Sequence, residues 1–183
     1  MLLQKRAINI DGMRTPQLIA MSGLPGSGKS TVAEGLARQF QIPILSIDPA
    51  EAAMWASGLK KTDTGIAAYQ VVQALAAENL KLGTSVVIDA VNPVEAARDM
   101  WRMLAAEQNV PLTFIEVVCS DQATHRERIE SRVRGIAGMS EITWEQVQAR
   151  QNEYEPWRDD RILLDSFQSD PQTLIAAAID CLA

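Results

Sequence analysis

Residues 18–31 read LIAMSGLPGSGKST, an apolar run followed by a glycine-rich turn that ends in Lys-Ser-Thr. The spacing of Gly23, Gly28 and Lys29 matches the phosphate-binding loop that joins a strand to a helix. Glycines let the backbone turn its N–H groups inward to hold phosphate oxygens, and a helix starting near Lys29 adds its N-terminal dipole. The stretch therefore predicts a site for a nucleoside triphosphate.

We expect this phosphate loop (residues 23–31) to bind ATP and Mg²⁺. Lys29 is placed to reach the β- and γ-phosphates, and the Ser30 hydroxyl to ligate the metal. A glycine-rich turn with a chance lysine is the alternative, but the apolar run before the loop and the helical pattern after it favour the nucleotide site. The residues predicted to bind the nucleotide are Gly23, Gly26, Ser27, Gly28, Lys29, Ser30 and Thr31, the last as an early helix residue without a direct role.

Short apolar runs alternate with longer helical patterns along the chain. Most runs are continuous, as expected when helices cover both faces of a parallel sheet. The alternation predicts a three-layer α/β domain with right-handed crossovers, in which ligands lie at the carboxyl ends of the strands. The runs are Leu18–Met21, Ile42–Ile47, Ser85–Ile88, Leu112–Cys119 and Arg161–Leu164, and the helical patterns cover 29–40, 64–82, 93–108, 121–134, 143–155 and 171–182.

Two aspartates follow the second and third apolar runs, and both should emerge at the same sheet edge as the phosphate loop. Asp89 ends an apolar strand, the Walker B arrangement, which places a carboxylate near Mg²⁺. Asp48 is better placed to accept the proton of an attacking hydroxyl and so to act as a catalytic base. A solvated strand end is the alternative interpretation of Asp89.

Three pairs, Asp48-Pro49, Asn92-Pro93 and Asp170-Pro171, also have the pattern of a helix N-cap followed by a first-turn proline. For Asp48 the cap competes with the role as base, and one carboxylate can serve both. For Asn92 a contact with substrate is the alternative to the cap.

Residues 125–134 read HRERIESRVR, the most basic stretch of the chain. Arg128 and Arg132 lie four residues apart on one helical face, and we expect them to belong to a lid around residues 121–142 that closes over ATP. There they would stabilise charge that develops on the transferred phosphoryl group. The alternative is a solvated helix in which Glu127 and Glu130 pair with the arginines. His125 is expected to be a surface or cap residue without a catalytic role.

Composition bounds the class of protein. The 183 residues suit one domain, which we place at residues 17–183 behind a short arm at 1–16. A formal net charge of -6 repels nucleic acid and anionic lipid, so neither is an expected partner. No apolar run approaches the ~20 residues of a membrane helix. Cys119 and Cys181 are expected to be buried, unpaired thiols, which fits a cytoplasmic protein, and oligomeric state is left open.

Together these segments resemble the AAA_33-type P-loop kinases, which include polynucleotide 5′-kinase domains, chloramphenicol phosphotransferase, gluconate kinase and zeta-toxin kinases. The resemblance lies in residues 23–31, Asp48, Val86–Pro93 and Arg126–Arg134, with Arg98 and Trp101 at a familiar distance. It implies the P-loop NTPase fold, a five-stranded parallel sheet in the order 2-3-1-4-5 and an arginine-bearing lid. In contrast to many members, no arginine follows Asp48 closely, which argues against a phosphorylated or nucleotide acceptor.

The leading hypothesis is therefore a kinase that transfers the γ-phosphoryl group of ATP to a hydroxyl of a small-molecule acceptor. The alternatives are a polynucleotide or nucleotide-sugar kinase and a regulatory ATPase that transfers nothing. The acidic net charge disfavours the polynucleotide kinase. The residues that would carry out transfer are Asp48, Lys29, Arg128 and Arg132, with Ser30 and Asp89 at the metal.

Overall fold

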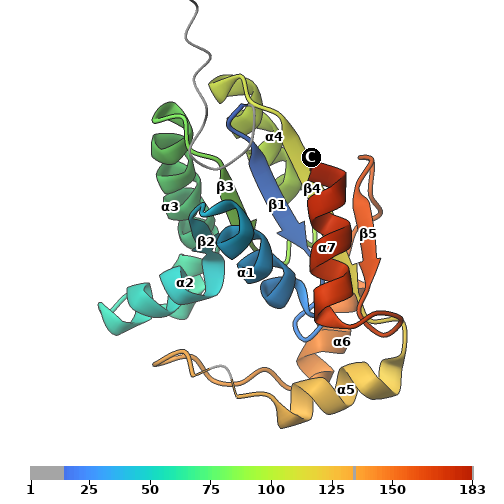
Figure 1. Cartoon of the computed structure of the whole chain (residues 1–183). Helices are drawn as coiled ribbons and strands as arrows, with labels where there is room; N and C mark the ends of the chain where they lie inside the picture. The colour runs from blue at the N-terminus through green and yellow to red at the C-terminus, as the bar shows by residue number, and fades with distance from the viewer. Residues whose placement is uncertain (1–14, 134, 183) are drawn as a thin grey trace, which may run out of the picture.

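The computed structural model describes residues 15–133 and 135–182, which form an α/β domain (Figure 1). Most of the predicted arm and Arg134 of the predicted lid lie outside these residues. The elements are β1 (Leu18–Ser22), α1 (Lys29–Phe40), β2 (Ile44–Ser46), α2 (Ile47–Ala56), α3 (Lys61–Lys81), β3 (Val86–Asp89), α4 (Glu95–Gln108), β4 (Leu112–Val118), α5 (Gln122–Ser131), α6 (Trp144–Asn152), β5 (Ile162–Asp165) and α7 (Pro171–Leu182).

The five strands form one parallel sheet in the order β2-β3-β1-β4-β5, which confirms the predicted topology. Strand β1 is central and every one of its residues is buried, which is why its sequence is continuously apolar up to Ser22. In the sheet register Ser46 lies beside Asp89, so β2 and β3 end together. The carboxyl ends of all strands face the side where α5 and α6 lie (Figure 1).

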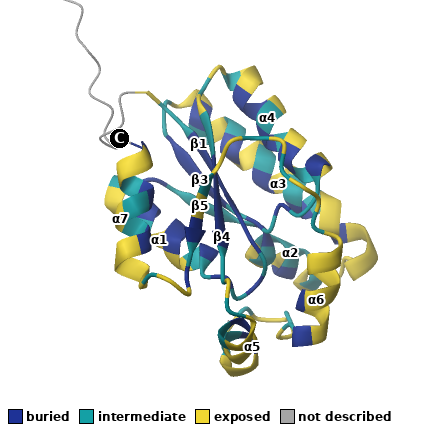
Figure 2. Ribbon diagram, turned by 90° about the vertical axis from the view of Figure 1, so that its right-hand side faces the viewer, coloured by how far each residue is buried: buried dark blue, intermediate teal, exposed yellow. Residues whose placement is uncertain are grey.

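Side chains of β1 alternate between two hydrophobic cores, one on each face of the sheet. Ile19 and Met21 pack with α1 and α7, while Leu18 and Ala20 pack with α3 and α4. Figure 2 shows the buried residues on the strands and the inward faces of these helices. Gly35 brings α1 close to α7, because a Cβ there would lie only 2.4 Å from Ile175 Cδ1. Burial on both faces makes the sheet a rigid base for the loops at its carboxyl edge.

A third, smaller cluster lies beyond the carboxyl edge and joins α5 to α6. Its buried members are Ile129, Trp144 and Val147, with Leu24 of the phosphate loop packed against them. The predicted lid is therefore anchored to the loop that it would cover. Among the described helices, none is both long and apolar enough to cross a membrane.

Several local predictions are corrected by the structure. Of the three predicted N-caps only Asp170 caps its helix: its Oδ1 accepts hydrogen bonds from the backbone N–H groups of Gln172 and Thr173 at 2.9 and 3.1 Å. Helix α2 begins one residue before Asp48, and α4 begins at Glu95, three residues after Asn92. The cysteines are unpaired as predicted, but Cys119 is half-buried and Cys181 exposed.

Candidate active site

The phosphate loop has a backbone that only glycine can adopt at its turning points. Gly23, Gly26 and Gly28 have φ angles of 129°, 82° and 97°. A Cβ on Gly23 would lie 2.2 Å from the carbonyl oxygen of Val117, and one on Gly26 would lie 2.7 Å from Ile129 Cδ1. The loop is thus held closely between β4 and α5, and substitution of these glycines would require both backbone strain and displacement of a neighbour.

Helix α1 starts directly after the loop with Gly28 as its N-cap and no side-chain cap. The first N–H groups of a helix have no partner within the helix, so an uncapped N-terminus that follows a glycine turn can bind an anion. Lys29 Nζ lies 3.8 Å from Asp89 Oδ1, and their side chains are only 8% and 12% exposed. Asp89 therefore lies at the same sheet edge as the phosphate loop, and the structure adds an ion pair with Lys29 that the sequence did not predict.

A cavity of about 650 Å³, here called the loop cavity, opens beside this N-terminus. Its walls are the loop, the C-terminal end of α5 and the segment after β5. Seven of the eleven predicted site residues line the loop cavity, and the other four do not. Of these four, Gly23 and Ser27 line a separate cavity, and Asp48 and Asp89 line neither of these two cavities. The predicted residues that line the loop cavity are Gly26, Gly28, Lys29, Ser30, Thr31, Arg128 and Arg132.

The arginines of α5 divide into those that face the loop cavity and one that faces solvent. Arg128 reaches across the cavity rim and donates to Ser166 Oγ at 2.7 Å and to the Ser166 carbonyl at 3.0 Å. Arg132 is the C-cap residue of α5 and lines the same cavity. Arg126 is exposed and pairs with Glu130 at 2.7 Å, so the solvated-helix interpretation describes that residue.

His125 is not a surface or cap residue, which corrects the prediction from sequence. It is 6% exposed, and its Nε2 lies 2.7 Å from the carbonyl oxygen of Pro25 in the phosphate loop. A carbonyl only accepts, so Nε2 carries the proton. Burial lowers the pKa of His125, the bond to Pro25 opposes the shift and Arg128 adds to it. A neutral imidazole therefore holds the loop onto α5.

Asp48 lies in the first turn of α2, two residues beyond Ser46, whose strand neighbour is Asp89. It lines a second cavity of about 440 Å³, here called the carboxylate cavity, which is bounded by α2, the start of α3, α6 and the segment before α6. The cavity includes Glu51 and Trp55 from α2 and Arg150 from α6. The two predicted carboxylates thus emerge from adjacent strands at the edge that also carries the phosphate loop.

A family model described as AAA domain, AAA_33, matches residues 18–157, which contain the phosphate loop, both aspartates and the basic helix. The chain belongs to the AAA_33 family. Among curated proteins, none matches the chain.

Solved structures share the fold of this AAA_33 protein. APS kinase CysC from Mycobacterium tuberculosis, in complex with AMPPNP and APS, has a TM-score of 0.69 and 18% identity over 92% of this chain and 98% of that one. A gluconokinase from Sinorhizobium meliloti has 0.65 and 21% over 92% of each chain. Kti12 from Chaetomium thermophilum, in complex with ADP-AlF3, has 0.65 and 20% over 91% of this chain and 99% of that one. The fold is that of P-loop kinases.

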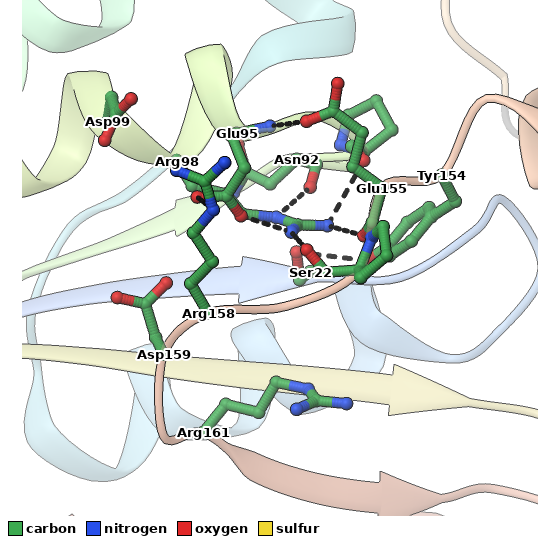
Figure 3. Close-up of polar contacts among 12 residues, drawn as sticks. Ser22, Asn92, Glu95, Arg98, Asp99, Tyr154, Glu155, Arg158, Asp159 and Arg161 are labelled. Carbon is green, nitrogen blue, oxygen red and sulfur yellow. Dashed lines mark hydrogen bonds and ion pairs between the residues drawn. The ribbon is translucent and has the colours of Figure 1, made fainter.

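The AAA_33 match also spans a buried polar cluster that sequence patterns did not reveal. Arg98 of α4 is fully buried, and its guanidinium donates to the carbonyls of Asn92, Pro93, Glu155 and Pro156 and to Glu95 Oε1 (Figure 3). The rings of Tyr154 and Trp157 lie 5.3 and 3.8 Å from it. Arg98 thus fastens the chain leaving α6 to the loop that follows Asp89.

Asn92 and Tyr154 extend this cluster to β1. The Asn92 amide donates to the Met21 carbonyl at 2.7 Å and its Oδ1 accepts from Trp101 Nε1 at 2.9 Å, so it is a buried cross-link and neither a cap nor an exposed substrate contact. Tyr154 donates its hydroxyl to Ser22 Oγ at 3.3 Å. The hydrogen bonds of this cluster join residues up to 132 positions apart, so no local sequence pattern reveals it. The only signal in the sequence was the spacing of Arg98 and Trp101 in the family resemblance.

The residues present at the AAA_33 site fit a magnesium ion. Asp89 Oδ1 is buried and, although it faces Lys29 Nζ at 3.8 Å, accepts no hydrogen bond from the described residues, so a metal ion or its hydration water would satisfy it. Among the described residues, no group of three or more His, Cys, Asp or Glu is placed to hold a metal. Proteins commonly hold Mg²⁺ by one or two side chains together with phosphate oxygens.

Proposed function

We propose that the chain is an ATP-dependent kinase that phosphorylates a hydroxyl of a small-molecule acceptor. The observation that carries the proposal is the pairing of a phosphate loop with a carboxylate, Asp48, that emerges beside Asp89 at the same sheet edge and lines its own cavity. The gluconokinase and the APS kinase that share the fold support a small acceptor.

In the proposed reaction the loop amides and Lys29 bind the β- and γ-phosphates, and Asp48 receives the proton of the acceptor hydroxyl. The acceptor oxygen forms a bond to the γ-phosphorus while the bond from that phosphorus to the β–γ bridging oxygen breaks, and ADP leaves with the electron pair. Arg132 and Arg128 stabilise the negative charge of the transferred group.

Ser30 and Asp89 are the residues that would hold Mg²⁺. Bound there, the ion would neutralise phosphate charge. We also propose that the site prefers ATP over other nucleotides and that the lid arginines take part in catalysis.

The test is transfer of labelled γ-phosphate to an added mixture of hydroxyl compounds, compared with release of free phosphate. We expect Asp48→Asn to bind an ATP analogue as the wild type does and to lose about 10²-fold or more in transfer, the scale of general-base catalysis. Lys29→Ala should lose nucleotide binding itself. The exposed Asp180 of α7 supplies the matched control, Asp180→Asn.

Unchanged transfer by Asp48→Asn would remove Asp48 as the base. Release of free phosphate with no labelled acceptor would favour a regulatory ATPase over a kinase.

A further inference from the structure

The carboxylate cavity allows an inference about the acceptor, which rests on the proposed function because the cavity contains Asp48. We propose that it binds a compound with several hydroxyl groups and no negative charge, either neutral or bearing an amine. Its volume of about 440 Å³ lies within the range of small-molecule sites, about 300–1,000 Å³.

The inner wall of the cavity is built before any ligand arrives. Thr64 of α3 is fully buried and joins the two α2 side chains of that wall: its hydroxyl donates to Glu51 Oε1 at 2.9 Å and accepts from Trp55 Nε1 at 2.7 Å. The indole ring and the Glu51 carboxylate are therefore fixed in place. Because they are already ordered, a ligand would lose little free energy in ordering them.

The charges around the cavity are unevenly distributed. Four carboxylates line it, and the two nearest α2, Asp48 and Glu51, are half-buried. The two cations, Lys61 and Arg150, are exposed. With four carboxylates against two cations, the described side chains that line the cavity carry a negative formal charge. An anionic acceptor would lose hydration beside like charge, whereas hydroxyl and ammonium groups would donate hydrogen bonds to these carboxylates.

The indole ring of Trp55 already attracts a cation. Lys61 Nζ lies 4.4 Å from the ring centroid, a cation–π distance. That contact is made within the protein, and the C–H groups of a polyol would pack on the part of the indole that lines the cavity.

The described lining residues of the carboxylate cavity include no arginine that a hydrogen bond between described residues holds in position. Carboxylate and phosphate ligands are commonly bound by a guanidinium that is fixed in a bidentate geometry. Among the described residues that line the cavity, Arg150 is the only arginine, and it stands exposed on α6. The inner wall that carries Asp48 therefore selects hydroxyl groups by carboxylate acceptors.

Three acyclic six-carbon polyols that differ at one end test the proposal: sorbitol, glucamine and gluconate, which are neutral, cationic and anionic. Binding to the full chain is measured by ligand-observed NMR with an ATP analogue present. We expect sorbitol and glucamine to bind at least about threefold more tightly than gluconate, the scale of a partly screened charge interaction. Glu51→Gln should weaken the binding of glucamine, and Glu34→Gln, at an exposed position on α1, should not.

Equal or tighter binding of gluconate overturns the proposal, and so does the failure of all three polyols to bind. Calorimetry with the ATP analogue alone separates this result from the proposed kinase function. If the analogue binds and gluconate is preferred, the kinase stands and only the acceptor class is wrong. If the analogue does not bind, the kinase itself fails.

Discussion

Arg128 holds one rim of the loop cavity in place by binding Ser166. Its two hydrogen bonds to Ser166 connect α5 to the segment after β5, and both segments line the cavity that opens at the start of α1. A guanidinium that is already oriented loses little freedom when a nucleotide arrives.

We therefore expect Arg128→Ala to weaken the binding of an ATP analogue by about 10-fold, the effect of losing one charged hydrogen-bonding group. Arg126→Ala is the matched control, because Arg126 is on the same helix but pairs with Glu130 in solvent. Calorimetry on both variants makes the comparison, and equal affinities would show that Arg128 has only a structural role.

At this scale the sequence predicts residues whose geometry is set locally. Gly23 and Gly28 have the positive φ angles that the predicted turn requires, because a turn of this kind is encoded by the residues within it. Ser166 and the buried state of His125 could not be predicted, because their partners lie 38 and 100 residues away. No local period encodes such contacts.

At the scale of the elements, Arg98 links α4 to the chain that leaves α6. It connects α4 to residues 155–156, and the Glu155 carboxylate accepts a hydrogen bond from the first N–H group of α4 at 2.6 Å. Burial opposes ionisation of Glu95, but hydrogen bonds from Arg98 and Arg102 lower the pKa of that carboxyl. The chain leaving α6 is thereby tied to the helix that follows the Asp89 loop.

Substitution of Arg98 should lower the stability of the fold. Arg98→Met removes the donor of the Asn92, Glu155 and Pro156 carbonyls and one of the two described arginines that donate hydrogen bonds to Glu95, so we expect a loss of about 3–5 kcal/mol in the free energy of unfolding. Arg158 has a side chain that is 80% exposed and lies 3.9 Å from Glu95. Arg158→Ala should change stability by about 0.5 kcal/mol or less, and urea unfolding of both variants measures the difference. Equal losses would refute the special role of Arg98.

At this scale the sequence predicts the elements better than their ends. All five strands lie where apolar runs predict them, because burial on both faces dictates composition. The caps at Asp48 and Asn92 fail for a tertiary reason: Asn92 is drawn into the core by Met21 and Trp101, and α4 starts later. At Asp170 no competing partner intervenes in the structure, and the local rule holds.

Over the whole molecule, the stability of the fold should depend on the chain's single histidine. Its folded pKa lies below the ordinary value of 6.5, so below that pH the unfolded chain binds a proton that the folded chain does not. We expect the free energy of unfolding to be greatest above this value and to fall as pH decreases from about 7 to about 5, before most carboxylates titrate. Urea titrations over this range should show the slope.

His125→Gln is the matched variant, and its profile should be flatter. A wild-type profile that is flat over the same range would show that the histidine titrates equally in both states.

The global arrangement could be predicted from the alternation of strands and helices together with the family resemblance, which supplied the sheet order. The cavities could not. The loop cavity forms where α1, α5 and the segment after β5 approach one another. The carboxylate cavity forms where α2 approaches α6, so that Asp48 and Trp55 meet Arg150 only through the tertiary fold.

Among the described residues, none lines both the loop cavity and the carboxylate cavity. If the chain has the proposed function, a substitution of an α2 side chain in the carboxylate cavity would therefore alter the choice of alcohol and leave the contacts of the triphosphate unchanged. Acceptor specificity and nucleotide binding could then change independently, in evolution or by protein engineering.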